Sequence, residues 1–286
     1  MLDTLIQGLL LGGLYALFAL GLSLMFGVMR LTNTAQGDFI VLAGFVVIAV
    51  APLVAQSSIA ATVLVLPLAF AAGYALQRWV LNGTLGRDPL PSLVVTFGLS
   101  IVIQNVLHAV FSADPLSLDS GGFSTRSLLL GEGVAIGALP LAILVLTLVI
   151  TASLQALFDR TALGRAFRAV SDDREIAELM GLDSRKVYAL ATAIAFVVIA
   201  LGGALQAMRT TVSPSDGPLL LLFAFEAVII GGMGSFWGTF AGAMVLGLAQ
   251  QIGFRLDPGW GIWVGHLVFL AVLVLRPQGL WPKTRG

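Results

Sequence analysis

The sequence predicts an all-α integral membrane protein, a polytopic bundle of about eight or nine transmembrane helices with a short cytoplasmic helix. Of its 286 residues, 58% are hydrophobic and only 10% are charged, whereas soluble domains carry about a quarter charged residues. The mean hydropathy is +1.00. Apolar stretches recur along the whole chain with no soluble domain between them, so we interpret residues 1–286 as a single transmembrane domain.

The first five apolar stretches occupy the N-terminal half of the chain. A transmembrane helix needs about 20 apolar residues to cross about 30 Å of hydrocarbon. The first stretch begins near Met1 with no positively charged segment before it, and it is longer than the apolar region of a signal peptide. We therefore expect it to be a spanning helix. The five stretches are 5–28, 39–55, 59–80, 93–111 and 134–157.

A charged segment, residues 158–186, follows the fifth stretch. Within it, Asp172 is placed to cap the N-terminus of a short helix, and Glu175 three residues later completes a pattern similar to a capping box. Gly181 is placed to end this helix as the first residue beyond its C-terminus. The spacing therefore predicts a short helix with marked ends inside a charged loop.

The predicted short helix has one apolar face, because Ile176, Leu179 and Met180 fall at positions i, i+3 and i+4. Such a face must be buried against something. It lies on the bilayer surface or against the protein's own helix ends, or it docks into a groove on a cytoplasmic partner. Composition alone favours the first pair of alternatives.

Four further apolar stretches follow, at residues 187–208, 219–233, 237–253 and 260–275. The second and third of them are short, and the glycine-rich segment 231–235 separates them. Short, glycine-interrupted segments occur in membranes where they line a cavity or are buried in protein. This pair therefore forms either two short spans or one re-entrant hairpin.

The distribution of Lys and Arg predicts the orientation in the membrane. With the 158–186 loop in the cytoplasm and sides alternating from there, twelve of the fifteen cations lie inside, and only Arg126, Arg209 and Arg255 lie outside. This bias is what the positive-inside rule expects. The N-terminus is then external and the C-terminus cytoplasmic.

The sequence lacks the residues and motifs that several functional classes require. There is no cysteine and the formal net charge is zero, so thiol chemistry is excluded and nothing suggests a nucleic-acid partner. No phosphate-binding loop, H-E-x-x-H or G-x-S-x-G motif occurs. We expect His108 and His266 to be interfacial or hydrogen-bonded histidines. The chain is therefore predicted to be no enzyme and to hold no cofactor or metal of its own.

The short cytoplasmic helix carries a family motif. The pattern formed by Glu175, Ala177 and Gly181 resembles the E-A-A-x-x-x-G core of ABC importer permeases, with Ile176 departing from it at the second position. Further segments are similar to branched-chain amino acid permeases of the LivH type, which are related to permeases for urea and short amides. These segments are 8–17 (GLLLGGLYAL), 31–39 (LTNTAQGDF), 226–242 (EAVIIGGMGSFWGTFAG) and 275–280 (LRPQGL).

This resemblance implies a permease of the bacterial inner membrane that works with partners. They are a second related permease, two cytoplasmic ATPase subunits that hold ATP and Mg, and an external substrate-binding protein. The substrate would be a branched-chain or related amino acid. The cytoplasmic helix would couple the permease to the ATPase. The coupling residues are then Arg165, Arg168, Glu175, Ile176, Ala177, Leu179, Met180 and Gly181.

Polar residues within or beside the spans are candidates for the translocation path, because polar groups in hydrocarbon are costly and are paired or functional. We favour a helix N-terminal role for Asp38, and hydrogen bonds between helices for Gln104 and Asn105. For Glu226 two roles are left open: it is either a buried residue with a structural partner or a residue that lines the path. The candidates are Asn33, Gln36, Asp38, Gln104, Asn105 and Glu226.

The alternative function is an ion-coupled secondary transporter or a channel for small polar solutes. Glu226 and the glycine-rich break at 231–235 favour it. Against it, six of the fifteen cations lie in the 158–186 loop, as a docking surface requires. The exact substrate, and whether the permease pair is made of identical or different chains, are left open.

Overall fold

The computed structural model describes residues 1–86, 90–124, 126–129 and 135–281. The described part of the chain is an α-helical bundle with one small hairpin, β1 (Ser127–Leu129) antiparallel to β2 (Ala135–Gly137). Two 3-10 turns, η1 (Ala51–Val54) and η2 (Leu81–Gly83), extend the ends of helices. The helices are α1 (Leu2–Met29), α2 (Gln36–Val50), α3 (Ser58–Trp79), α4 (Leu90–Phe111), α5 (Ala138–Arg160), α6 (Ala162–Asp172), α7 (Arg174–Leu179), α8 (Ser184–Arg209), α9 (Gly217–Gly231), α10 (Phe236–Leu256) and α11 (Gly261–Leu275).

The chain is an all-α polytopic membrane protein, and each of the nine predicted apolar stretches corresponds to a helix, although α5 starts only at Ala138, after β2. Within the described residues, six helices are long and apolar enough to cross a membrane: α1, α2 with η1, α3 with η2, α4, α5 and α8. The pair α9 and α10 adds up to one more, and the 15 residues of α11 form a shorter apolar helix. The expected count of eight or nine spans is therefore approximate.

The centre of the bundle is formed by α1 and α8. In their most apolar windows, 89% of α1 and 78% of α8 are buried within the chain, against 22% for both α3 and α4. Glycine allows the close approach of α1 to α10, because a Cβ on Gly12 would lie 2.8 Å from the carbonyl oxygen of Ala243. Small residues have this role where lipid supplies no hydrophobic drive for helix association. The outer helices α3, α4 and α5 expose apolar side chains, as a lipid-facing or partner-facing surface does.

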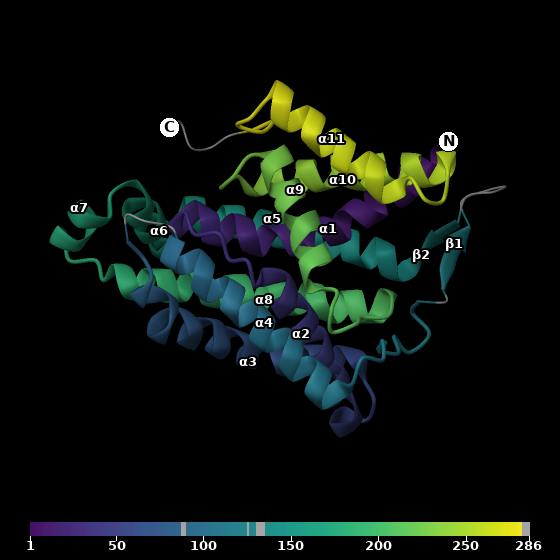
Figure 1. The fold of residues 1–286 in the computed structure, drawn as a ribbon, viewed down its shortest axis with the longest axis horizontal. Coiled ribbons are helices and arrows are strands. Elements are labelled where there is room, and N and C mark those ends of the chain that lie inside the picture. Colours follow the sequence, from purple (N-terminus) through teal and green to yellow (C-terminus); the bar gives the residue numbers. More distant parts are fainter. Residues whose placement is uncertain (87–89, 125, 130–134, 282–286) are drawn as a thin grey trace.

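Helix α9 runs across the bundle rather than along it (Figure 1). It makes an angle of 117° with α10 across the break at 232–235, where Gly232 and Gly234 adopt positive φ angles of 104° and 80°. At its other end α9 meets the start of α2, where a Cβ on Gly37 would overlap the carbonyl oxygen of Gly217. Glycine at both ends thus permits the transverse course of α9.

The two ends of the bundle differ in what they carry. The N-terminus and the β-hairpin lie at the end opposite to α6 and α7 (Figure 1). At the α6 end, the Ser171 hydroxyl donates to the carbonyl oxygen of Gly27 at 2.8 Å. The backbone of Trp281 returns to the same region, since its N–H donates to the carbonyl of Gly231. The last described residues therefore lie toward the end that carries α6 and α7.

Candidate functional site

The charged segment 158–186 contains two short helices, where we predicted one. Helix α6 is capped by Thr161, whose hydroxyl accepts a hydrogen bond from the N–H of Gly164 at 3.0 Å. Its apolar face is buried through Phe167 and Val170. A Thr followed by apolar residues at helical spacing is the signal that could have revealed α6.

The cap of α7 lies one residue later than predicted. Asp173, not Asp172, is the N-cap, and its Oδ1 accepts a hydrogen bond from the N–H of Ile176 at 3.0 Å. Asp172 is instead the last residue of α6. The reason is the packing of α6, which keeps Asp172 helical and leaves Asp173 in the extended conformation that an N-cap requires.

Gly181 ends α7 as predicted. It has a φ of +89°, and its N–H donates to the carbonyl of Glu178 at 3.0 Å. The N–H of Leu182 donates to the carbonyl of Ala177, also at 3.0 Å. These two bonds form a Schellman motif, for which a left-handed glycine is the preferred residue.

The apolar face of α7 is exposed. Ile176, Leu179 and Met180 are 59%, 87% and 81% accessible, whereas Ala177 is 4% accessible and points into the protein. Glu175 is exposed beside this face. Among the residues that the structure describes, nothing covers the three apolar side chains, so the protein's own helix ends are not their partner. The bilayer surface and a cytoplasmic partner are the two alternatives that stand.

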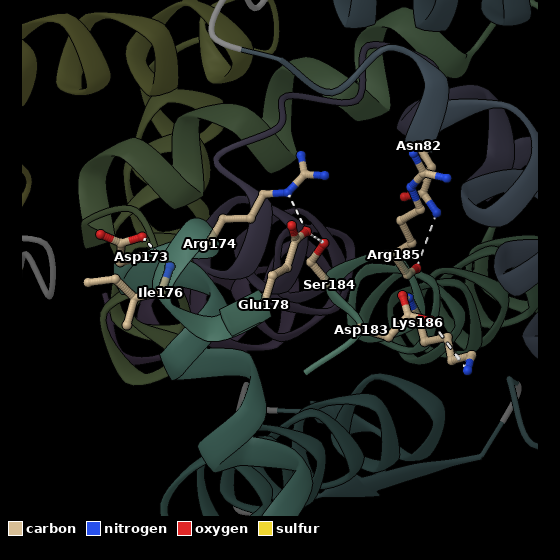
Figure 2. A network of polar contacts seen from close by, with 9 residues as sticks. All are labelled: Asn82, Asp173, Arg174, Ile176, Glu178, Asp183, Ser184, Arg185 and Lys186. Carbon is tan, nitrogen blue, oxygen red and sulfur yellow. Dashed lines mark hydrogen bonds and ion pairs between the residues drawn. The ribbon is translucent and has the colours of Figure 1, made fainter. Parts of the chain in front are cut away.

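Hydrogen bonds join α7 to the start of α8 (Figure 2). The Glu178 carboxylate accepts from the Ser184 hydroxyl, and also from Nε of Arg174 at 3.0 Å. These two donors hold the pKa of Glu178 below its usual range, the Ser184 bond being the larger cause. The Arg174 guanidinium lies 5.9 Å from the ring centroid of Tyr188. The far side of α7 from its apolar face is thus attached to α8.

A second link ties the start of α8 to the end of α3. The side chain of Asn82 donates to the carbonyl of Arg185 at 3.1 Å. Asn82 accepts from Gln77 at 3.1 Å, and Gln77 accepts from the hydroxyl of Thr192 at 2.8 Å. A displacement of α7 would therefore reach both α8 and α3.

Arg165 and Arg168, the two arginines predicted to couple the permease to the ATPase, have different surroundings. The Arg168 guanidinium donates to the carbonyl of Phe158 and lies 4.0 Å from the Asp159 carboxylate. It therefore stabilises the corner between α5 and α6. Arg165 is exposed. A charge change at Arg168 would thus disturb the loop itself, whereas one at Arg165 would alter the surface.

Two of the polar path candidates meet between α2 and α4. Nε2 of Gln104 donates to Oδ1 of Asp38 at 2.9 Å, and Asp38 is 1% accessible. Asp38 does lie in the first turn of α2, where we placed it. Asn105 is exposed and donates to the carbonyl of Ile101 in its own helix. Gln104 thus forms the expected bond between helices, and Asn105 lies outside the cluster.

Asn33 and Gln36 are fully buried beside the start of α2. Oδ1 of Asn33 accepts from the N–H of Ala35 at 3.0 Å, and Nε2 of Gln36 donates to the carbonyl of Phe18 at 2.8 Å. Nδ2 of Asn33 and Oε1 of Gln36 have no partner among the described residues. Buried polar atoms without partners are costly, and Asn33 and Gln36 stay candidates for the path.

Glu226 and His266 form a pair that joins α9 to α11. Oε1 of Glu226 and Nδ1 of His266 are 2.5 Å apart, and the carboxylate is almost completely buried. Its Oε2 has no partner among the described residues. His266 is thus a hydrogen-bonded histidine, one of the two states we expected, while His108 is exposed on α4. The sequence offered no signal for this pairing.

Comparison with known proteins places the chain in a family. The family described as the branched-chain amino acid transport system permease component matches residues 4–276. The chain belongs to this family. The permease is 28% identical to the branched-chain amino acid permease BraD of Pseudomonas aeruginosa, with 98% of this chain and 95% of BraD covered. It is 25% identical to LivH of Salmonella typhimurium, over 98% and 94% of the two chains.

One further relative of the permease is named for a different substrate. The fructose import permease FrcC of Rhizobium meliloti is 30% identical over 68% of this chain and 58% of FrcC. Among solved structures, PsaBC from Streptococcus pneumoniae in complex with Fab matches with a TM-score of 0.49 and 11% identity, covering 97% of this chain and 92% of that one. The family match and the similarity to BraD and LivH confirm the resemblance to LivH-type permeases. These relatives are named as transport permeases and not as enzymes. This permease is a multi-pass membrane transport protein.

Proposed function

We propose that this permease is the membrane subunit of an ATP-driven importer that carries branched-chain or related amino acids across the bacterial inner membrane. One observation carries the proposal. An apolar face of three large side chains on α7 is exposed at one end of the bundle, while the opposite side of α7 is hydrogen-bonded to α8. A helix with this arrangement is suited to lie in a groove of a second protein.

The proposed partners follow from this face and from the family. Two cytoplasmic ATPase subunits would receive α7 and would bind ATP and Mg. A second, related permease would cover part of the outer helices, and an external protein would deliver the substrate. In this arrangement α6, α7 and the C-terminus are cytoplasmic, and the N-terminus is external. The exposed Glu175 would lie at the rim of the contact with the ATPase.

The proposed mechanism is mechanical. ATP binding and hydrolysis on the partner would displace α7, and the Glu178–Ser184 and Asn82–Arg185 links would carry that movement into α8 and α3. Rigid-body tilting of packed helices is a common way to alternate between two states. Each partner or substrate shifts the balance only by its differential affinity for the two states.

Capture of the ATPase tests this proposal. We expect Leu179→Asp to abolish co-purification of a soluble ATPase with the permease extracted from its native membrane. Leu128→Asp is the matched control, because Leu128 is 56% accessible and lies in β1, outside the membrane-spanning helices and at the end of the bundle opposite to α7 (Figure 1). Equal ATPase capture by both variants would contradict the proposal. Purification of the native permease with no ATPase bound to it would contradict the proposal as well.

A second candidate function is an ion-coupled transporter, and the Glu226–His266 pair favours it. Ionisable residues inside a membrane often mark proton or ion pathways. This candidate predicts that vesicles containing the permease alone take up solute on an ion gradient without ATP. It also predicts that Glu226→Gln abolishes that uptake. No uptake by such vesicles would leave the importer as the function.

A further inference from the structure

A cavity of about 380 Å³ lies at the end of α8 that is remote from α6 and α7. Its volume falls in the usual range of about 300–1,000 Å³ for small-molecule sites. Side chains from α1, α8, α9, α10 and α11 surround it. Its lining includes the polar and aromatic residues Tyr15, Gln206, Arg209, Asp216, Phe223 and Gln250. None of them is among the path candidates that the sequence suggested.

The cavity wall holds two opposite charges that do not neutralise each other. Arg209 and Asp216 both line the cavity, and they form no ion pair. Within the described part of the chain, the Arg209 guanidinium has no hydrogen-bond acceptor. Asp216 accepts one backbone N–H, from Ser213, through its Oδ2. A cation and an anion held apart in one cavity are suited to a ligand that carries both charges.

A hydrogen bond between two buried side chains lies behind the wall. Gln250 is 1% accessible, and its Oε1 accepts a hydrogen bond from the Tyr15 hydroxyl at 2.6 Å. This bond leaves Nε2 of Gln250 without a partner among the residues that the structure describes.

The remaining wall is apolar. Leu14 and Phe18 of α1 face the cavity, as do Leu220 and Phe223 of α9. All four are buried. The rings of Tyr15 and Phe223 pack against each other with centroids 4.8 Å apart and an interplanar angle of 31°. The cavity thus combines two separated charges and an apolar surface.

We propose that this cavity binds a zwitterionic amino acid with an apolar side chain. Arg209 holds the carboxylate, Asp216 holds the ammonium group, and the Leu and Phe side chains enclose the aliphatic part. The inference rests on the proposed importer function and adds a substrate site to it. Because α8 has 26 residues and rises about 1.5 Å per residue, the site lies about 40 Å from α7. It is therefore a binding site near the external entrance of the translocation path.

Binding of tritiated L-leucine to the purified full-length permease in lipid nanodiscs tests the site. We expect saturable binding to the native chain, with L-leucinamide and 4-methylpentanoate competing at least about tenfold more weakly, because each lacks one charge. Arg209→Gln should weaken L-leucine binding at least about tenfold and leave L-leucinamide competition unchanged. Arg255→Gln is the matched control, because Arg255 lies at the same end and donates to Thr4 outside the cavity.

A second variant keeps the test decisive if Arg209→Gln does not elute as a monodisperse protein. Asp216→Asn removes the anion, and we expect it to abolish the preference for L-leucine over 4-methylpentanoate. No binding of L-leucine by the native permease would overturn the proposal, and so would equal binding by the native, Arg209→Gln and Asp216→Asn chains.

Failure of this site and failure of the importer proposal give different results. A permease that captures an ATPase through α7 but binds no L-leucine overturns the cavity site alone. A permease that binds L-leucine through Arg209 but captures no ATPase contradicts the importer and leaves the cavity site intact.

Discussion

The Glu178 carboxylate accepts a hydrogen bond from the Ser184 hydroxyl, and this bond joins the end of α7 to the first residue of α8. Helix α7 has only six residues, and a helix of that length is not stable by itself in water. Its position therefore depends on the Asp173 cap, the Gly181 turn and the Glu178–Ser184 bond. Under the proposed mechanism, a force applied to the apolar face of α7 would be carried into α8 through these contacts.

Loss of this bond should uncouple hydrolysis from transport. We expect Ser184→Ala to leave the ATPase bound, because the apolar face is untouched, but to lower severalfold the amino acid taken up per ATP hydrolysed. The measurement is made on the assembled complex in proteoliposomes. Ser153→Ala is the control, since the Ser153 hydroxyl bonds only to its own helix, at Val149. An unchanged ratio in Ser184→Ala would show that the bond does not transmit movement.

The same contacts predict a response to acid. Hydrogen bonds from Ser184 and Arg174 lower the pKa of Glu178, and the backbone N–H of Lys186 is the largest cause that lowers the pKa of Asp183. Because both folded-state pKa values are depressed, their stabilisation is complete above the ordinary carboxyl pKa of about 4 and is lost as the pH falls through the lowered values. Salt screens such exposed groups, so we expect the effect to be confined to α7, through Glu178, and to the start of α8, which Asp183 caps.

Amide hydrogen exchange, corrected for intrinsic rates, checks this response. We expect the protection of α7 to stay constant from about pH 7 to about pH 5 and to fall only under more acidic conditions. In Glu178→Gln, protection should already be reduced at neutral pH and should change less on acidification. A loss of protection near neutral pH in the native chain would contradict the assigned groups.

The crossing of α2 and α9 should not tolerate a side chain at Gly37. A Cβ there would overlap the Gly217 carbonyl, and forcing atoms into a packed contact costs about 1–3 kcal/mol or more. We expect Gly37→Ala to lower the melting temperature and the yield of monodisperse protein in detergent. Gly98→Ala, where a Cβ meets nothing within 4 Å, should have no such effect. Equal behaviour of the two variants would refute the close crossing.

The buried Glu226–His266 pair should show strong coupling in a double-mutant cycle. His266→Leu leaves a buried carboxylate without its partner, and an unsatisfied buried group costs about 1–3 kcal/mol, more if charged. Replacing both residues by Leu removes the unsatisfied group, so the double variant should recover most of the lost stability. Thermal unfolding in detergent measures all four proteins. Additive losses would mean that the two side chains do not interact.

The positions of the membrane helices followed from the sequence alone. Runs of apolar residues long enough to cross hydrocarbon are a local property, and each predicted stretch matches a helix in the structure to within a few residues. The Gly181 turn and the apolar face of α7 were predictable for the same reason, since caps and helical spacing depend on neighbours in the chain. The family resemblance could be recognised from the sequence for the same reason, because its motifs are short continuous segments of the chain.

Tertiary structure decided the features that depend on how helices pack. Asp172 and Asp173 are equivalent caps by local chemistry, and only the burial of Phe167 and Val170 sets where α6 stops. Asp38 meets Gln104 across 66 residues, and Tyr15 meets Gln250 across 235. The apolar pattern of a helix specifies that it is buried in lipid or protein, but not which neighbour it touches or at what angle. The crossing of α9, and with it the cavity of Arg209 and Asp216, arises because glycine at Gly37 and Gly217 lets two backbones meet.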